Sequence, residues 1–336
     1  MTDTGGPVLV TGGTGFLGQR VVRRLVETGR PVRALVRPGT NPGAFDSIRA
    51  DVPGSRIELV AAGLGDPAGL AAAVRGVVSV LHLAAAKLGS TAAQVASTVV
   101  GSDNLFQASL EAKLPRIVTV SSLGIVGAAG VPRGALIDED TPLEPHPERR
   151  DPYTFAKLRQ EQLAWRYHRD SGLPLVVLRP GVIFGPGQNL LSARVGLNLF
   201  GVFLHLGGGM TVPLTYVDNC ADAIVKASVA PGIEGCVYCV VDDDLPTSRM
   251  LLRLYRRKVQ AIPFVPVPFA LLQLLARLNL WYSERTQGHL PAVFTPYKVD
   301  SMWKGHRFSN ARLKRDIAWE PRYPMAEALE RSFVVC

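Results

Sequence analysis

The fold of this chain is decided by Pro7-Val8-Leu9-Val10-Thr11-Gly12-Gly13-Thr14-Gly15-Phe16-Leu17-Gly18. An apolar run leads into a glycine-rich turn, and residues 19–27 then carry apolar side chains at helical spacing. A strand, a turn and a helix in this order make a site for a dinucleotide's diphosphate, because the helix N-terminus offers free N–H groups and a partial positive charge. Gly12 permits the tight turn, Gly15 lets backbone approach phosphate oxygens, and Gly18 lets the helix pack closely. The predicted cofactor contacts here are Gly12, Thr14, Gly15, Phe16, Leu17 and Gly18.

Runs rich in Val and Ile alternate with helical segments along the rest of the chain. We predict strands at 7–11, 31–36, 57–61, 78–83, 116–121, 174–179 and 236–241, and helices near 16–28, 67–75, 90–112 and 153–171. This alternation is typical of an α/β fold, a doubly wound parallel sheet of the Rossmann type. We expect residues 1–180 plus 214–242 to form the dinucleotide-binding domain. Residues 181–213 plus 243–336 would form a smaller, interleaved substrate lobe.

The composition, with 47% hydrophobic and 19% charged residues, fits a soluble globular enzyme. The formal charge of +9 comes from scattered basic residues, which favours phosphorylated cofactors or acidic substrates over nucleic acid. The four cysteines do not suit a disulfide framework, and the pair Cys236 and Cys239 lies in a predicted buried strand rather than a metal site. No metal site is expected. With no signal peptide before the first strand, a cytoplasmic location is the default.

One apolar segment complicates this interpretation. Residues 262–278 follow a basic cluster and contain three prolines and an arginine, so their helical part is too short to span a bilayer. A hydrophobic lid or a subunit contact is favoured, and an interfacial membrane contact is the alternative. The helices at 90–112 and 153–171 are long enough for the four-helix contact of a homodimer.

The end of the second strand indicates which cofactor fits. An NAD-specific site usually has Asp or Glu there to bond the ribose hydroxyls. This chain has Val36 at that position and Arg37 directly after it. A guanidinium is a permanent positive fork that suits a 2′-phosphate, so NADP(H) is predicted, with NAD(H) as the alternative. Arg33 either reinforces Arg37 or points into solvent.

The segment Asp151-Pro152-Tyr153-Thr154-Phe155-Ala156-Lys157 predicts a helix start, with Asp151 as N-cap and Pro152 in the first turn. Tyr153 and Lys157 then lie one turn apart on one face. An ammonium and a helix N-terminus both favour the phenolate, so we expect the pKa of Tyr153 to be lowered. Ser122 follows the fifth strand, where ligands of such sheets bind, and its hydroxyl can hold a carbonyl oxygen. We predict that Ser122, Tyr153 and Lys157 are catalytic.

Taken together, these motifs resemble the extended short-chain dehydrogenase/reductase superfamily, also called the NAD-dependent epimerase/dehydratase group. The resemblance implies that Tyr153 is the acid/base, that Lys157 also holds the nicotinamide ribose, and that Ser122 orients the substrate oxygen. It further implies that backbone at Pro180, Val182 and Ile183 lines the nicotinamide, with Gly181 allowing close approach to the ring. Leu64 and Ala84, after the third and fourth strands, are assigned to the cofactor as well. The resemblance rests on Thr11–Gly18, His82–Ala85, Ser121–Gly127, Tyr153–Lys157, Leu178–Gly187, Tyr216–Asn219 and Phe308–Lys314.

Some positions depart from the family pattern. Gly63 stands where the family commonly has an Asp that meets adenine, so adenine would be held by backbone or by Asp66 in a shifted register. The run Arg179-Pro180-Gly181-Val182 lacks the substrate-binding Asn of nucleotide-sugar epimerases. It looks more like the branch with 3β-hydroxysteroid dehydrogenases and dihydroflavonol-type reductases.

The predicted function is an NADP(H)-dependent oxidoreductase that reduces a carbonyl, or oxidises the alcohol, of a fairly apolar small molecule. A nucleotide-sugar epimerase or dehydratase with tightly bound NAD is the runner-up, and a non-catalytic dinucleotide sensor is a third hypothesis. Among other polar residues, His82 is expected to be packed rather than catalytic. Asp218 is expected to cap a helix at 220–229, and the acidic run 138–140 to be exposed.

Overall fold

The computed structural model describes residues 5–86, 89–286 and 294–333. A seven-stranded parallel sheet forms its centre, with the strand order β12-β7-β5-β4-β1-β2-β3. All seven strands had been predicted, each to within one or two residues. They are β1 (Val8–Thr11), β2 (Val32–Val36), β3 (Ile57–Ala61), β4 (Ser79–His82), β5 (Ile117–Val120), β7 (Leu175–Pro180) and β12 (Cys236–Val240).

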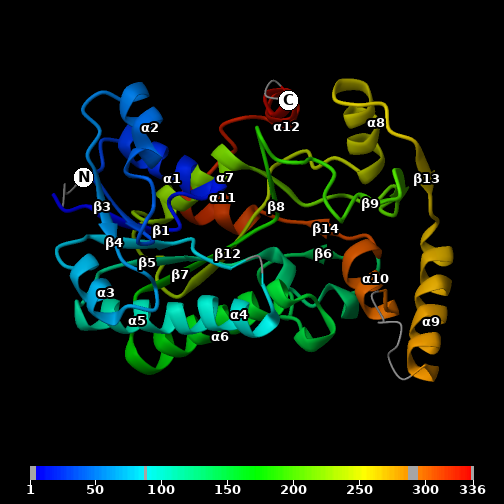
Figure 1. The fold of residues 1–336 in the computed structure, drawn as a ribbon, viewed down its shortest axis with the longest axis horizontal. Helices are drawn as coiled ribbons and strands as arrows, with labels where there is room; N and C mark the ends of the chain where they lie inside the picture. The colour runs from blue at the N-terminus through cyan, green and yellow to red at the C-terminus, as the bar shows by residue number, and fades with distance from the viewer. Residues whose placement is uncertain (1–4, 87–88, 287–293, 334–336) are drawn as a thin grey trace.

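Helices cover both faces of this sheet, as Figure 1 shows. Because side chains alternate along a strand, Val8 and Val10 pack on one face and Leu9 on the other. The first face is covered by α1 (Phe16–Glu27), α2 (Asp46–Asp51), α7 (Val217–Ala227) and α11 (Ala311–Ile317). The second is covered by α3 (Pro67–Ala73), α5 (Gly101–Glu111) and α6 (Pro152–Ser171). The fold is therefore the doubly wound Rossmann-type α/β fold that the sequence predicted.

Several details differ from the sequence prediction, two of them in the helices that cover the central sheet. Helix α2, with the 3₁₀ turn η1 (Pro42–Phe45) before it, was not predicted, although Phe45 and Ile48 are buried in the core. The helix expected at 90–112 is divided into α4 (Thr91–Val95), a π-helical turn η2 (Ala96–Val100) and α5. In this irregular turn the Thr98 side chain accepts a hydrogen bond from the Ala86 amide, which ties the helix to the loop after β4.

The remaining elements pack around the carboxyl end of the sheet. Two strands, β8 (Val182–Phe184) and β11 (Leu214–Tyr216), form a parallel pair, and a three-stranded sheet has the order β13-β10-β9. Its strands are β9 (Gly196–Leu199), β10 (Val202–His205) and β13 (Phe264–Pro266). The other elements are η3 (Leu123–Ile125), η4 (Ala128–Gly130), β6 (Leu136–Ile137), η5 (Pro147–Arg149), α8 (Ser248–Lys258), α9 (Phe269–Arg285), α10 (Pro296–Trp303), β14 (Arg307–Phe308) and α12 (Met325–Phe333).

The parallel register puts the candidate residues at one edge of the sheet. Thr11 pairs with Leu35 of β2 and with His82 of β4, and Val120 of β5 pairs with Leu178 of β7. The glycine-rich turn and the segments after β2, β4, β5 and β7 therefore emerge side by side. In sheets of this kind, ligands bind at this edge.

Candidate active site

The glycine-rich turn has the shape that a diphosphate site needs. Gly12 has a left-handed backbone with φ +71°, and a β-carbon there would lie 3.0 Å from the Ala84 nitrogen. A β-carbon on Gly18 would lie 2.1 Å from the Gly12 carbonyl oxygen, so only glycine lets α1 pack on the turn. Gly15 caps α1 without a side-chain hydrogen bond, and both Thr14 and Gly15 are exposed. The first N–H groups of α1 are thus open to an anion, and the turn fits a dinucleotide diphosphate.

The first residues of α1 connect this turn to the other end of the candidate site. Phe16 and Leu17 are half-buried. A β-carbon on Gly185, just after β8, would lie 3.2 Å from the Phe16 ring. Phe16 and Leu17 also pack against the same apolar cluster as Val182 and Ile183, two of the residues predicted to line the nicotinamide.

Arg37 and Arg33, both on β2 or at its end, have different surroundings. Arg37 is exposed, and no hydrogen bond or ion pair joins its guanidinium to another described residue. Arg33 Nε donates to Glu58 Oε2 at 2.7 Å, and its Nη1 donates to the carbonyl oxygens of Ala73 and Arg75. Four residues of strand also separate the two arginines by about 13 Å. Both expectations for Arg33 are therefore wrong: it neither reinforces Arg37 nor points freely into solvent.

Hydrogen bonds fix the loop after β3, where adenine contacts are predicted. The Leu64 carbonyl oxygen accepts a hydrogen bond from Asn104 Nδ2 at 2.9 Å, which fixes the loop after β3. Asp66 caps α3, and its Oδ1 accepts from the Gly69 amide at 3.0 Å. Asp66 is exposed, and both alternatives for adenine, backbone contact and Asp66 in a shifted register, stay predictions. On the opposite side, the Ala84 amide donates to Thr11 Oγ1 at 3.3 Å.

Ser122 and Tyr153 come together at the end of β5. Asp151 caps α6 as predicted, with its Oδ1 accepting from the Thr154 amide at 2.9 Å, and Pro152 occupies the first turn. Tyr153 is therefore fixed near the start of this helix. Ser122 Oγ accepts from the Gly124 amide at 3.1 Å, and its hydroxyl is near enough to the Tyr153 phenol to lower the pKa of that phenol slightly. A carbonyl oxygen placed against both hydroxyls would meet two donors.

The pKa of Tyr153 shifts in the direction opposite to the one expected from the sequence. Burial of the phenol and, to a smaller degree, the nearby Asp151 carboxylate raise the pKa of Tyr153 to about 12, although Ser122 offsets a part. The spacing of Tyr153 and Lys157 had suggested a lowered value, but burial dominates. In the cofactor-free protein Tyr153 is thus a neutral phenol near neutral pH, which is the form that donates a proton.

Lys157 is buried and held by two short hydrogen bonds. Its Nζ donates to the Val120 carbonyl oxygen and to Gln160 Oε1, each at 2.5 Å. An ammonium has only donors, so this contact fixes the orientation of the Gln160 amide. The amide nitrogen then faces Ser102 Oγ at 2.7 Å and His82 Nε2 at 3.0 Å.

The network continues from His82 to the glycine-rich turn. His82 Nδ1 lies 2.7 Å from Thr11 Oγ1, and Ser102 Oγ donates to the Thr98 carbonyl oxygen at 2.5 Å. Burial lowers the pKa of His82 to about 3, with the Lys157 charge as the smaller cause, so the imidazole is neutral. His82 is packed and hydrogen-bonded, as expected. Sequence reasoning missed Gln160 and Ser102, whose spacing from Lys157 and His82 along the chain carries no signal.

The segment after β7 shows why Gly181 is a glycine. A β-carbon there would lie 2.2 Å from the Pro213 carbonyl oxygen, and the Val182 amide donates to that same oxygen at 2.6 Å. The close approach is thus to the chain before β11, and the expectation of close approach to a nicotinamide ring is not needed to explain it. This packing places the backbone of Pro180, Val182 and Ile183 at the carboxyl edge of the sheet.

Two minor sequence expectations are wrong. Asp218 lies inside the first turn of α7 and pairs with Arg20 at 3.5 Å, while Tyr216 occupies the cap position. The acidic run is not fully exposed, because Glu139 is buried and accepts from the Cys239 amide at 2.7 Å. Burial raises the pKa of Glu139.

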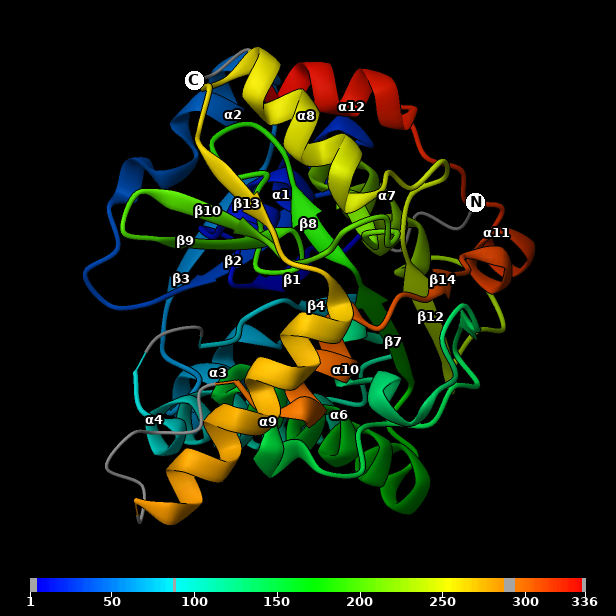
Figure 2. The same cartoon turned by 90° about the vertical axis from the view of Figure 1, so that its right-hand side faces the viewer.

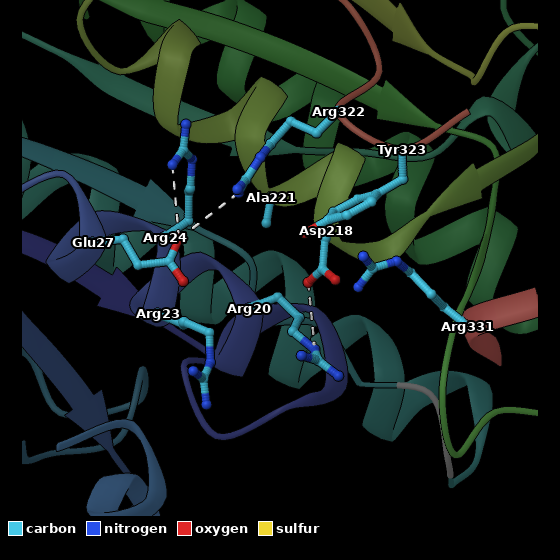
Figure 3. A pocket seen from close by; sticks show the side chains of 9 residues that line it. All are labelled: Arg20, Arg23, Arg24, Glu27, Asp218, Ala221, Arg322, Tyr323 and Arg331. Carbon is cyan, nitrogen blue, oxygen red and sulfur yellow. Dashed lines mark ion pairs between the residues drawn. The ribbon is translucent and has the colours of Figure 1, made fainter. Parts of the chain in front are cut away.

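An arginine-rich pocket of about 220 Å³ lies over α1 and α7, outside this edge of the sheet (Figure 3). Its arginines have protein partners: Arg24 pairs with Asp222 at 2.7 Å, and Arg322 pairs with Glu27 at 3.7 Å. The positive charge is thus matched locally. Its lining residues are Arg20, Arg23, Arg24, Glu27, Asp218, Ala221, Arg322, Tyr323 and Arg331.

Two further findings concern the described part of the chain. No group of three or more His, Cys, Asp or Glu side chains is placed there to hold a metal ion. None of the helices described is both long and apolar enough to cross a bilayer.

Comparison with known proteins identifies the family. The model of the NAD dependent epimerase/dehydratase family matches residues 8–235. The chain belongs to this family. It is 30% identical over 341 residues to the 2-alkyl-3-oxoalkanoate reductase of Stenotrophomonas maltophilia (strain K279a), covering 96% of this chain and 97% of that protein. It is 27% identical to the 3beta-hydroxysteroid-dehydrogenase/decarboxylase isoform 1 of Arabidopsis thaliana, covering 99% and 80%.

Among solved structures, gox2253 superposes with a TM-score of 0.80 and 27% identity, covering 98% of this chain and 97% of that one. The relatives are named reductases and dehydrogenases, and the chain is an NAD(P)-dependent enzyme of the extended short-chain dehydrogenase/reductase type.

Proposed function

We propose that this enzyme is an NADP(H)-dependent reductase of a carbonyl group in a fairly apolar small molecule. The observation that carries the proposal is the placement of Ser122 directly after β5, next to Tyr153 in the first turn of α6 and one helical turn from the buried Lys157, at the carboxyl edge of the sheet. When bound, the dinucleotide supplies the hydride to the carbonyl carbon.

Side chains of the enzyme bind the substrate oxygen, donate the proton and hold the cofactor. The Ser122 hydroxyl holds the substrate oxygen, and the Tyr153 phenol donates its proton to that oxygen as negative charge develops there. The raised pKa of Tyr153 keeps the phenol protonated until the cofactor and substrate are in place. Lys157 holds the nicotinamide ribose and keeps a positive charge beside the phenolate that forms.

Arg37 supports the choice of NADP(H). Its guanidinium is exposed, free of protein partners among the described residues, and directly follows β2, where the adenosine ribose of a bound dinucleotide lies in such folds. Val36 offers no carboxylate to bond a 2′-hydroxyl. The diphosphate would be held by Gly12–Gly18, and adenine by backbone near Leu64.

An apolar substrate is supported by the relatives. The names 2-alkyl-3-oxoalkanoate reductase and 3beta-hydroxysteroid-dehydrogenase/decarboxylase describe enzymes of compounds with large hydrocarbon parts. We propose that residues 181–213 plus 243–336 form the lobe that binds such a substrate, while residues 1–180 plus 214–242 hold the cofactor.

The experiment is an NADPH consumption assay with three substrates: a 2-alkyl-3-oxoalkanoate, a 3-oxosteroid and UDP-glucose. We expect one NADPH to be consumed per carbonyl reduced, with an apolar ketone and not with the sugar nucleotide. Any nucleotide that copurifies with the protein is identified in parallel.

Two outcomes would contradict the proposal. Tightly bound NAD, with conversion of UDP-glucose and no net change in cofactor absorbance, would indicate an epimerase. NADPH binding without oxidation across a broad carbonyl panel would indicate a sensor.

A further inference from the structure

Helix α9 has two apolar faces, and among residues 5–86, 89–286 and 294–333 only one of these faces is covered. On the inner face, Leu272 and Ala276 are buried in a cluster with Val299 and Trp303 of α10. The outer face carries large apolar side chains that are 45–57% exposed. Their spacing of three and four residues aligns them in one stripe along the helix. The stripe consists of Leu271, Leu274, Leu275, Leu278, Trp281 and Tyr282.

Strand β13 extends this surface beyond the helix. Phe264 is 38% exposed and Val265 is 48% exposed. In Figure 2, α8, β13 and α9 follow one another across the side of the molecule that faces the viewer, and Figure 1 shows them together at its right-hand edge. We call β13 together with the outer stripe of α9 the apolar strip. Exposed apolar surfaces of this extent mark an interaction site.

Basic side chains adjoin the apolar strip. Residues 253–285 contain six basic residues and one acidic residue, Glu284. The Arg256 guanidinium lies 4.8 Å from the centroid of the Phe264 ring, which joins the basic end of α8 to the strip. Among the described residues, no carboxylate forms an ion pair with Arg253, Arg257 or Arg277, although Lys258 pairs with Glu330.

This charge pattern distinguishes between two partners that could cover the apolar strip, a second copy of the chain and a lipid surface. A symmetric contact with a second copy would place the same surface on both sides, so the basic end of each α8 would face like charge with one acidic residue to offset it. An anionic lipid surface matches both the charge and the apolar side chains of this region. Its negative charge attracts the basic residues, and its interface takes up leucine, tryptophan and tyrosine. Helix α9 has 17 residues and contains Arg277, so it suits lying in the interface plane.

We propose that the apolar strip and the basic end of α8 dock on the surface of an anionic lipid bilayer. Helix α10 packs on α9 and also on η4, which follows the Ser122 segment by a few residues. Helix α10 thus lies between the helix that carries the apolar strip and η4. The proposal concerns a surface outside that site and does not depend on the catalytic assignment.

The test is co-sedimentation of the full chain with vesicles. One set is phosphatidylcholine alone, and the other is an equimolar mixture of phosphatidylcholine and phosphatidylglycerol. We expect binding to the mixed vesicles that weakens as salt rises, and at least about tenfold weaker binding to the neutral ones.

Two double variants probe the two parts of the surface, and each has a matched control. Leu274→Ser with Leu278→Ser removes apolar side chains that are already exposed, so the fold should persist; Val229→Ser, at a position 46% exposed elsewhere, is its control. Arg253→Gln with Arg257→Gln removes unpaired charge; Arg56→Gln with Arg169→Gln is its control. We expect each double variant to weaken vesicle binding about tenfold or more and each control to leave it unchanged.

Absence of binding to the mixed vesicles overturns the proposal, as does binding that survives both double variants. A change of oligomeric state in the Leu274→Ser, Leu278→Ser variant, measured by light scattering, overturns it in favour of a contact between copies. NADPH affinity of each variant serves as the check of folding.

Discussion

Gln160→Leu should reduce catalysis strongly while changing nothing that touches substrate. The side chain of Gln160 supplies one of two carbonyl-type acceptors, each 2.5 Å from the Lys157 ammonium, and its amide nitrogen joins that ammonium to Ser102 and His82. All of these groups are buried. Leucine fills nearly the same space but offers no hydrogen-bond acceptor. The Lys157 ammonium therefore keeps its charge but is no longer held in one position.

The magnitude follows from the kind of bond that is lost. A hydrogen bond to a charged group is worth about 1.5–3 kcal/mol. If the position of Lys157 is needed only in the transition state, that loss corresponds to a decrease in kcat/KM of roughly 10- to 150-fold. Because a buried ammonium is left with one acceptor fewer, we also expect a loss of stability of about 1–3 kcal/mol, measured by urea unfolding.

The assay compares three variants with the wild type, using NADPH and the best ketone found. Gln160→Glu keeps an acceptor toward Lys157 and should retain more activity than Gln160→Leu, with a changed pH profile because the new carboxylate raises the pKa of the ammonium. Gln162→Leu changes an exposed amide on the same helix and is the control for helix propensity. Wild-type kcat/KM in a folded Gln160→Leu protein would refute the reasoning.

Three further predictions concern the cofactor and the acid. Arg37→Ala should weaken NADPH binding by about 10- to 150-fold and NADH binding little, because a charge-assisted bond to the 2′-phosphate is worth about 1.5–3 kcal/mol. Arg33→Gln is the matched control. Equal losses of affinity for both cofactors in Arg37→Ala would exclude phosphate recognition by Arg37. Tyr153→Phe should keep NADPH affinity and lower turnover by about 10²–10⁴-fold, and full activity would remove Tyr153 from the mechanism. Burial raises the pKa of Tyr153 to about 12, so the phenol stays protonated below that range. The rate of carbonyl reduction should therefore fall only at strongly alkaline pH, where Tyr153 loses its proton, while the rate of alcohol oxidation should rise with pH. Rates measured in both directions against pH check this. A loss of the reduction rate from deprotonation of Tyr153 near neutral pH would contradict it.

The strands of the central sheet and its first turn could be predicted from local sequence patterns. The seven strands were found because each is a short apolar run bounded by turn residues, and the glycines of the first turn were found because their spacing is specific. Gly12 and Gly18 have the conformational and packing roles that the spacing predicted. Helix α2 was missed because its sequence, Asp46–Asp51, is short and mostly polar, and burial of Ile48 becomes evident only when α2 packs on the core.

The ionisation of the site could not be predicted in the same way. The spacing of Tyr153 and Lys157 was correct, but spacing gives neither the burial of the phenol nor the groups that hold the ammonium. Burial raises the pKa of Tyr153, while Lys157 donates to Val120 and Gln160. Arg33 was misjudged for a similar reason, because its partners Glu58, Ala73 and Arg75 are distant in sequence.

The sequence by itself determined the seven strands of the central sheet, the glycine-rich turn and the residue types at the candidate site. These depend on interactions among near neighbours in the chain, which a local pattern records. Only the tertiary structure decided which buried groups share hydrogen bonds, which arginine stays unpaired and which face of α9 remains uncovered. Such features depend on desolvation and on contacts between distant segments, because each polar group in a packed interior must find its partner wherever the fold places one.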